Sequence, residues 1–330
     1  MTDSRTDKNR RTGTTAVIVI SLAGVLFFGY QAVRVSTQRT QNNPFEYDIE
    51  RYKQTDARLV HYAETGQIPF ELPRASGLAI GPDANIYVAG DEAIHVFDTV
   101  GVLQSTIGVE EPIRCFALDN NRDLYVGMER HIEIYDLEGT KKAAWESPDS
   151  GAVFSALALS EDFVFVTDAG NRIVWKFDKS GNVLQRIGKR DVAKDIPGFV
   201  IPSGFFDVAV DSDGFLWVAN PGRHSIENYT LDGDFRTSWG AFSMEIDGFC
   251  GCCNPTNFII LEDGSFITSE KGIPRIKVHN QLGEVVSVVA GAEQFDEGTV
   301  GLDLAVDSNQ RIFVLDPKRK RVRIFAKKEA

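Results

Sequence analysis

The sequence of 330 residues predicts an all-β protein, a six-bladed β-propeller preceded by one N-terminal transmembrane helix. Two observations predict the propeller: a strand–turn–strand unit recurs six times, and its copies are spaced like four-stranded blades. A third observation, a run of 22 uncharged residues from Thr12 to Val33, predicts the helix. The expected organisation is a tail at 1–11, an anchor at 12–33, a polar linker at 34–57 and the propeller at 58–330.

The repeating unit is clearest in Val166–Gly188, which reads VTDAGNRIVWKFDKSGNVLQRIG. Apolar and polar residues alternate with a period of two, and Gly, Asn and Asp separate the runs, as in half-buried antiparallel strands. One strand should end at Asp168, the next should span Ile173–Phe177 and the third Val183–Ile187. So small a sheet cannot bury its face alone, so it needs neighbouring copies.

The copies are found by a short apolar strand that begins each unit. Its central residues are Ala79, Ala117, Ala158, Ala209, Ile259 and Ala305, separated by 38, 41, 51, 50 and 46 residues. These separations are typical of propeller blades, so six units predict six blades.

The units resemble NHL repeats over Gly77–Phe325. Blade three carries the family's turn as Asp168-Ala-Gly-Asn-Arg-Ile173, and blade four opens as DVAVDSDGFLWVAN. The Asn-His-Leu tripeptide itself is absent. The resemblance implies the propeller fold, but one fold hosts many functions, so it implies no particular activity.

The uncharged run 12–33 is long enough to cross a bilayer core of about 30 Å as a helix. Arg5, Lys8, Arg10 and Arg11 precede it, which favours a cytoplasmic N-terminus and an extracytoplasmic, periplasmic propeller held at the inner membrane. A cleavable signal peptide, cut after Ala23 or Ala32, is the alternative.

The segment Leu59–Leu72, LVHYAETGQIPFEL, predicts a strand, a glycine turn and a second strand. The C-terminal unit stops after its third strand, at Phe325. The N-terminal segment should therefore complete blade six, which would close the ring and leave no exposed sheet edge there.

Charge is unevenly distributed along the chain. The first 34 residues carry a net charge of +3, which leaves −15 for the linker and propeller. Nucleic-acid binding depends on basic surface, so an acidic body argues against a nucleic-acid partner.

The long insertions precede the innermost strands of blades four, five and six: Lys189–Phe206, Gly240–Thr256 and Gly291–Leu302. In a propeller these loops share one rim, here called the top rim, with the loops between second and third strands. Long loops on a rigid scaffold are where binding residues concentrate. The top rim is therefore expected to bind a partner protein or a small ligand.

The least generic stretch is Gly248–Pro255, which reads GFCGCCNP and holds three of the four cysteines. Together with Glu270-Lys271-Gly-Ile-Pro-Arg275 on the same rim, it is similar to bacterial NHL-type propellers of unassigned function that carry Gly-Cys-Cys-Asn-Pro and Glu-Lys-Gly-Ile. The candidate ligand-binding residues are Cys250, Cys252, Cys253, Asn254, Glu270, Lys271, Arg275, Asn220, Arg223 and His224.

Three interpretations of the cysteines stay open. Cys250 could form a disulfide with Cys252 or Cys253, or the adjacent pair could form a strained, labile one. The thiolates could bind a soft metal, or a thiol activated by Lys271 and Arg275 could react with a substrate or partner. The alternative function is thus a redox or metal-dependent enzyme, or an electron-transfer accessory. Glu270 and Lys271 are otherwise expected to form a surface ion pair.

A second candidate site lies where the innermost strands begin, at the mouth of the central channel. The aligned residues there are Gly77, Cys115, Ala156, Asp207, Asn257 and Asp303. Asp207, Asn257 and Asp303 offer oxygen ligands suited to Ca²⁺, although polar capping of strand ends would explain them too. Cys115 is expected to act as a small buried hydrophobe.

Whether the chain is an enzyme stays open. The propeller lyase that finishes peptide amidation resembles this fold and binds a metal in the channel through histidines. The five histidines here lie on different blades and none lies on an innermost strand, so that activity is not carried over.

Overall fold

The computed structural model describes residues 27–31, 49–194 and 196–329. The chain divides into two units, Met1–Ile49 and Glu50–Ala330. Residues 27–31 are helical, while the predicted tail 1–11 and most of the predicted anchor and linker lie outside the described residues. Among the residues that are described, no helix is long and apolar enough to cross a membrane.

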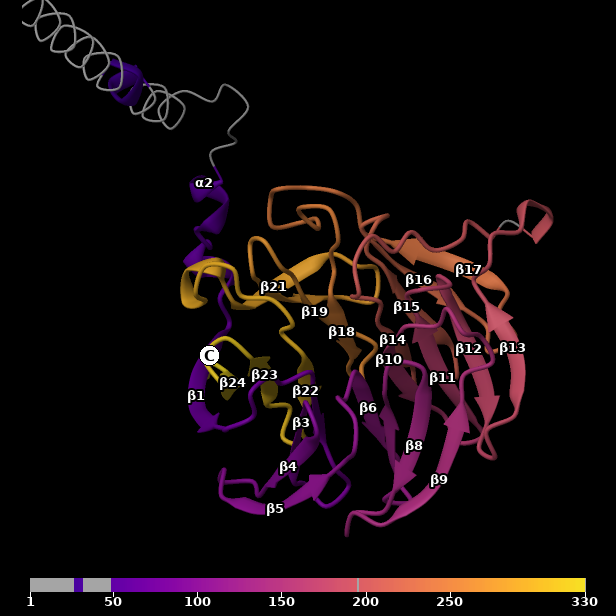
Figure 1. Cartoon of the computed structure of the whole chain (residues 1–330). Helices are drawn as coiled ribbons and strands as arrows, with labels where there is room; N and C mark the ends of the chain where they lie inside the picture. Colours follow the sequence, from indigo (N-terminus) through magenta and orange to yellow (C-terminus); the bar gives the residue numbers. More distant parts are fainter. Residues whose placement is uncertain (1–26, 32–48, 195, 330) are drawn as a thin grey trace, which may run out of the picture. The chain divides into compact units, whose positions relative to one another are not determined.

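The second unit is the predicted all-β propeller, built from six four-stranded antiparallel sheets (Figure 1). Blade one consists of β2 (Gly77–Ile80), β3 (Ile86–Gly90), β4 (Ala93–Phe97) and β5 (Leu103–Gly108). Blade two consists of β6 (Cys115–Leu118), β7 (Leu124–Gly127), β8 (His131–Tyr135) and β9 (Lys141–Glu146). Blade three consists of β10 (Phe154–Leu159), β11 (Phe163–Asp168), β12 (Ile173–Asp178) and β13 (Val183–Ile187). Blade four consists of β14 (Val208–Val210), β15 (Leu216–Asn220), β16 (Ser225–Tyr229) and β17 (Phe235–Trp239). Blade five consists of β18 (Asn257–Ile260), β19 (Phe266–Ser269), β20 (Ile276–His279) and β21 (Val285–Ala290). Blade six consists of β22 (Leu304–Val306), β23 (Ile312–Asp316), β24 (Arg321–Lys327) and β1 (Tyr62–Pro69).

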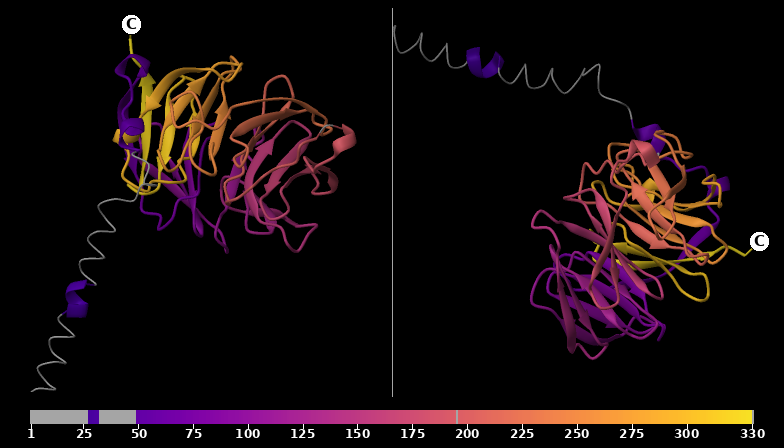
Figure 2. Two further views of the ribbon diagram at one scale, coloured as in Figure 1. Left: turned by 90° about the horizontal axis from the view of Figure 1, so that it is seen from above. Right: turned by 90° about the vertical axis from the view of Figure 1, so that its right-hand side faces the viewer.

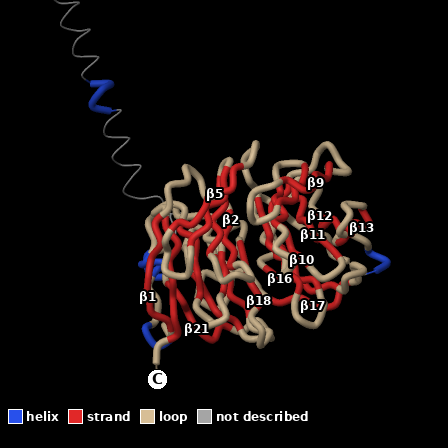
Figure 3. Tube along the Cα trace, turned by 90° about the horizontal axis from the view of Figure 1, so that it is seen from below, coloured by secondary structure: helices blue, strands red, loops and turns tan. Residues whose placement is uncertain are grey.

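The sheets form a ring because each innermost strand contacts the next. The order is β2, β6, β10, β14, β18 and β22, and β22 contacts β2. The core lies between neighbouring blades, where the faces of adjacent sheets bury their apolar side chains against each other. Between blades two and three, for example, the rings of Trp145 and Phe177 stack with their centroids 6.0 Å apart. Helical segments are short: α2 (Glu50–Lys53), η1 (Ala57–Leu59), η2 (Val192–Lys194) and η3 (Ala292–Gln294) (Figure 3).

Ring closure follows the prediction, because the N-terminal strand β1 is the outer strand of blade six. It pairs antiparallel with β24, from Tyr62 opposite Lys327 to Pro69 opposite Arg321. Figure 2 shows this N-terminal strand, in indigo, beside the C-terminal strand, in yellow. The expected glycine turn is wrong: the pairing register shifts between Glu64 and Gly66, so this glycine lies in a bulge within one continuous strand.

The closing strand is held by charge as well as by backbone pairing. Arg323 on β24 is 3% exposed and donates through Nη2 and Nε to the two carboxylate oxygens of Glu64, at 2.6 and 3.2 Å. Ile68 near the end of β1, and Phe70 and Leu72 just after it, are buried in the core between blades six and one. The N-terminal segment therefore contributes both pairing and core to the ring.

Candidate functional site

The cysteine loop, residues 240–256, connects β17 to β18 on the top rim. Asn254 ties it to the β19–β20 loop: its Oδ1 accepts from Lys271 N, and its Nδ2 donates to Lys271 O, both at 2.9 Å. The two sequence motifs singled out above are thus neighbours. An amide bonded on both sides to one residue's backbone fixes the distance between the loops.

Glu270 lies beneath this loop rather than on its surface. It is 1% exposed, its Oε2 lies 2.8 Å from Arg275 Nη2, and its Oε1 lies 3.0 Å from Lys277 Nζ. The backbone N–H of Cys250 donates to the same carboxylate at 3.2 Å. The expected surface ion pair of Glu270 with Lys271 is therefore wrong. The partners of Glu270 are two cations spaced two residues apart, Arg275 directly before β20 and Lys277 on it, and this spacing places both on the same face.

The two cations also hold the cysteine loop. Their side chains donate to backbone carbonyls at 2.8–3.4 Å, which are Met244, Glu245 and Gly248 for Arg275, and Ile246 and Gly248 for Lys277. Burial raises the pKa of Glu270, but the nearby Lys277 and Arg275 outweigh it, so that pKa lies below its usual value. Glu270, Arg275 and Lys277, here called the staple, thus form an ionised cluster that fixes the cysteine loop to blade five.

None of the four cysteines, all of which the structure describes, forms a disulfide. Cys250 packs against Ile273 and Ala292 in a small apolar cluster. The sulfurs of Cys252 and Cys253 lie 3.0 Å apart, with Cys252 exposed and Cys253 only 2% exposed. The structure therefore brings one exposed thiol and one buried thiol together in the loop.

The paired thiols differ in acidity. Burial raises the pKa of Cys253, but contacts with Cys252, Ser203 and Lys271 outweigh it, so that pKa is lowered. The hydrogen bond to Cys253 raises the pKa of Cys252. Cys253 is therefore the more acidic thiol of the pair, and its thiolate would accept a hydrogen bond from the Cys252 thiol. Such a pair can act as a soft nucleophile or as two soft metal ligands.

Replacing Lys271 by Gln should raise the apparent pKa of Cys253, since an ammonium beside a thiol stabilises the thiolate. The measurement is the alkylation rate of Cys253 in reduced protein over a pH series, read by mass spectrometry. Lys327→Gln, at the exposed end of β24, is the matched control. An unchanged pH profile in Lys271→Gln would show that this ammonium does not act on the thiol.

The three blade-four candidates separate into different roles. Asn220 is fully buried, accepts from Val200 N at 2.9 Å and donates to Glu227 Oε1 at 2.7 Å, so it shapes the insertion before β14. His224 packs edge-on against Phe242 of the cysteine loop, with ring centroids 5.2 Å apart. Arg223 is exposed. Of these three, Arg223 presents a charge to solvent, while the other two support the loops.

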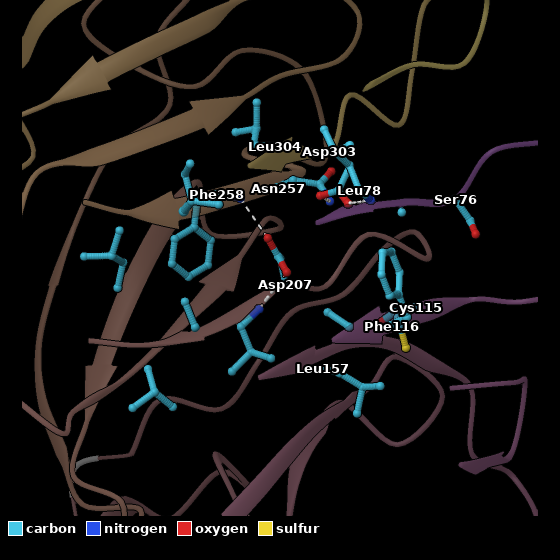
Figure 4. A pocket seen from close by; sticks show the side chains of 18 of the residues that line it. Ser76, Leu78, Cys115, Phe116, Leu157, Asp207, Asn257, Phe258, Asp303 and Leu304 are labelled. Atoms are coloured by element: carbon cyan, nitrogen blue, oxygen red, sulfur yellow. Dashed lines mark hydrogen bonds between the residues drawn. The ribbon is translucent and has the colours of Figure 1, made fainter. Parts of the chain in front are cut away.

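The channel mouth is a cavity of about 340 Å³. All six aligned residues of the sequence column line it: Gly77, Cys115, Ala156, Asp207, Asn257 and Asp303. Figure 4 labels four of them, Cys115, Asp207, Asn257 and Asp303. Asp207 Oδ2 accepts from Phe258 N on the next blade at 2.8 Å, and Asp303 Oδ2 accepts from Leu78 N at 2.7 Å. Each carboxylate therefore links the start of its own innermost strand to that of the next blade. This arrangement includes the expected capping of strand ends.

Not every polar atom at the channel mouth forms a hydrogen bond with another described residue. Asn257 Nδ2 donates to Asp303 Oδ1 at 3.2 Å, while the buried Oδ1 of Asn257 has no hydrogen-bond partner among the described residues. Burial, and then the charge of Asp303, raises the pKa of Asp207 to about 8; burial raises that of Asp303 to about 6. Within residues 27–31, 49–194 and 196–329, no three His, Cys, Asp or Glu side chains cluster as a metal site.

The stability of metal-free protein should fall as pH rises across this range. Unfolded Asp loses its proton near pH 4, whereas folded Asp207 keeps it to about pH 8. Between these values the folded state binds more protons, so each pH increase favours unfolding. Urea unfolding in EDTA from pH 5 to 8 should show the fall, and Asp207→Asn should reduce its slope. The exposed Asp263→Asn should keep the slope; equal slopes in all three proteins would contradict the prediction.

Sequence reasoning missed Lys277, Ser203 and Phe205. Lys277 completes the staple, Ser203 contributes to the lowered pKa of Cys253, and the Phe205 ring lies 5.1 Å from Lys271 Nζ. The alternation of Arg275 with Lys277 could have indicated that both face the same side. Ser203 and Phe205 belong to a different insertion, and no pattern in the sequence joins them to the cysteines.

Comparison with known proteins yields the fold. No protein-family model matches the chain, and no curated protein shows significant similarity to it. A streptogramin B lyase structure superposes with a TM-score of 0.55 at 11% identity, covering 81% of this chain and 98% of that one. A virginiamycin B lyase from Staphylococcus aureus gives 0.54 at 14%, covering 78% and 83%. A catalytically inactive form of that lyase with quinupristin gives 0.52 at 15%, with the same coverage. At such identities the likeness establishes the six-bladed propeller and no activity.

Proposed function

We propose that this chain is a membrane-anchored propeller with a cytoplasmic N-terminus and a periplasmic body, which binds a partner protein or small ligand on its cysteine-bearing rim. The anchor rests on the uncharged run 12–33 and the basic residues before it. Protease added to cells with a permeabilised outer envelope should degrade the propeller while cytoplasmic markers persist. Protection of the propeller would contradict this topology.

The observation that carries the rim proposal is the thiol pair of Cys252 and Cys253, with sulfurs 3.0 Å apart and one of them exposed. The loop that carries this thiol pair is held in place by the buried ion pairs of Glu270 and by the side chain of Asn254. A preformed loop loses little conformational freedom on binding, so more of the contact energy becomes affinity. The partner favoured by this chemistry carries a thiol, a disulfide or another soft group.

The redox alternative uses the same pair. The Cα atoms of adjacent residues are about 3.8 Å apart, whereas disulfides favour roughly 4.4–6.8 Å. A Cys252–Cys253 disulfide would thus be strained and a ready oxidant. One thiolate of a partner dithiol would attack one of the two sulfurs and release the other as a thiolate. The second partner thiolate would then resolve the mixed disulfide, so the partner is oxidised by two electrons and the pair is reduced.

Trapping should reveal the partner chemistry. In Cys252→Ser, Cys253 can still attack a disulfide but has no neighbouring thiol to resolve the product, so mixed disulfides on Cys253 should accumulate. Diagonal electrophoresis of cell extracts quenched in acid is the readout, with Cys253→Ser as the matched control. Equal trapping in both variants, or none in either, would overturn the thiol-based role. Stoichiometric metal in chelator-free protein, lost in the double Ser variant, would instead favour the soft-metal alternative.

We also propose Ca²⁺ as a ligand of the channel mouth, on the strength of one observation. The buried Oδ1 of Asn257, which lies beside the carboxylates of Asp207 and Asp303, accepts no hydrogen bond from the part of the chain that the structure describes. Oxygen donors of this kind suit Ca²⁺. Adding CaCl₂ at pH 8 should raise the melting temperature more than MgCl₂ does, and Asp303→Asn should abolish that gain. Equal effects of the two salts would contradict a Ca²⁺ site.

A further inference from the structure

A second cavity on the top rim, of about 820 Å³, lies between blades three and four. It is bounded by the β11–β12 turn, by residues 188–190, 192 and 196–200 of the insertion before β14, and by Arg223 from the β15–β16 loop. It shares no lining residue with the channel mouth and none with the cysteine loop. We call it the basic cleft, because of the side chains that line it.

Four cations line the basic cleft, Arg172, Lys189, Arg190 and Arg223, and all are exposed. In the part of the chain that the structure describes, none of the four forms an ion pair, and no carboxylate lines the cleft. The nearby Asp191 lines a neighbouring cavity, and its Oδ1 accepts from Ala193 N at 3.0 Å. Four clustered cations that form no ion pair within the described residues stand out on a chain of net charge −12.

The wall of the basic cleft is apolar and rigid. Ile196 and Phe199 are buried lining residues, and Phe199 packs edge-on against Phe206 and Tyr229. Gly188 leaves room for this ring, because a Cβ added there would lie 1.9 Å from Phe199 Cε2. The side chain of Asn220 also accepts from Val200 N, which fixes the insertion from beneath. The cleft is therefore a preformed apolar surface bordered by cations.

We infer that the basic cleft binds a small organic anion with an apolar body and a phosphate, sulfate or carboxylate group. Guanidinium and ammonium groups recognise oxyanions through charge-assisted hydrogen bonds. Arg223 uses one hydrogen bond, from Nη2 to Pro197 O at 3.2 Å, which orients its guanidinium and leaves other donors available. The volume lies within the range of small-molecule sites, roughly 300–1,000 Å³. This inference goes beyond the proposed function and holds whether or not the thiols react.

The test is calorimetric titration of the full chain in detergent with 1-naphthyl phosphate, 1-naphthol and inorganic phosphate. The naphthyl phosphate should bind more tightly than either fragment, since only it meets both the apolar wall and the cations. Arg190→Gln and Lys189→Gln, which remove charges that form no ion pair within the described residues, should each weaken its binding by about tenfold. Raised salt should weaken it further.

A matched pair of arginines controls for general charge. Arg172 in the cleft and Arg122 in a turn outside it are both exposed, with positive φ of 56° and 68°. Arg172→Gln should weaken binding and Arg122→Gln should not. Equal loss in both variants, equal affinity for naphthol and naphthyl phosphate, or no binding at millimolar concentration would each overturn the inference. Alkylation of Cys253 should be unchanged in Arg190→Gln, which separates this outcome from failure of the thiol proposal.

Discussion

A chain that begins at Arg74, and so lacks β1 and the segment after it, should fail to form a closed propeller. The deletion removes Ile68, Phe70 and Leu72 from the core between blades six and one. Truncating one such side chain costs about 2–5 kcal/mol, so losing three rivals the whole stability of a typical domain, about 5–15 kcal/mol. The freed edge of β24 would also be open to pairing with other chains. Size-exclusion chromatography should therefore show aggregates in place of the folded protein.

A point substitution keeps this prediction measurable if the truncated chain cannot be purified. Ile68→Ala should lower the free energy of unfolding by about 2–5 kcal/mol, because that side chain is 2% exposed. Gln67→Ala, on the exposed face of the same strand, should change it by less than about 0.5 kcal/mol. Urea unfolding followed by tryptophan fluorescence gives both values. A chain from Arg74 that melts like the full protein would show that β1 is dispensable.

Replacing Glu270 by Ala should destabilise the propeller by about 3–5 kcal/mol. The substitution leaves Arg275 and Lys277, which are 2% and 0% exposed, buried without a counter-charge. The backbone N–H of Cys250 also loses its acceptor. Because a lone buried charge is costly, adding Lys277→Met to Glu270→Ala should recover part of the loss, so the two substitutions should not be additive.

The measurement is urea unfolding at neutral pH of the single and double variants. Glu262→Ala, an exposed carboxylate on the same blade, is the control and should stay within about 0.5 kcal/mol of the parent. A loss below about 1 kcal/mol in Glu270→Ala would mean that the cluster is hydrated rather than a buried staple.

The fold could be predicted because its repeat is local. The turn at Asp168 and the strands that follow depend on alternation and turn residues within a few positions, so β13 has its predicted bounds and β12 ends one residue later. The composition of blade six could be predicted because the C-terminal unit lacks a fourth strand and the N-terminal segment provides a strand that belongs to no other unit. Whether Gly66 made a turn or a bulge depended on the register against β24, which Glu64 and Arg323 help to set across 259 positions.

The features of the sites can likewise be divided into those that the sequence determines and those that depend on contacts between distant residues. The sequence by itself determined six blades, their closure, and the neighbourhood of Cys252, Cys253 and Lys271, since propeller topology brings those loops to one rim. Only the tertiary structure decided that Glu270 is buried between Arg275 and Lys277, and that four cations from three loops border one cleft. Burial and long-range electrostatics depend on which side chains meet in space. A sequence pattern orients a side chain relative to its own strand, but it does not identify the neighbour supplied by the next blade.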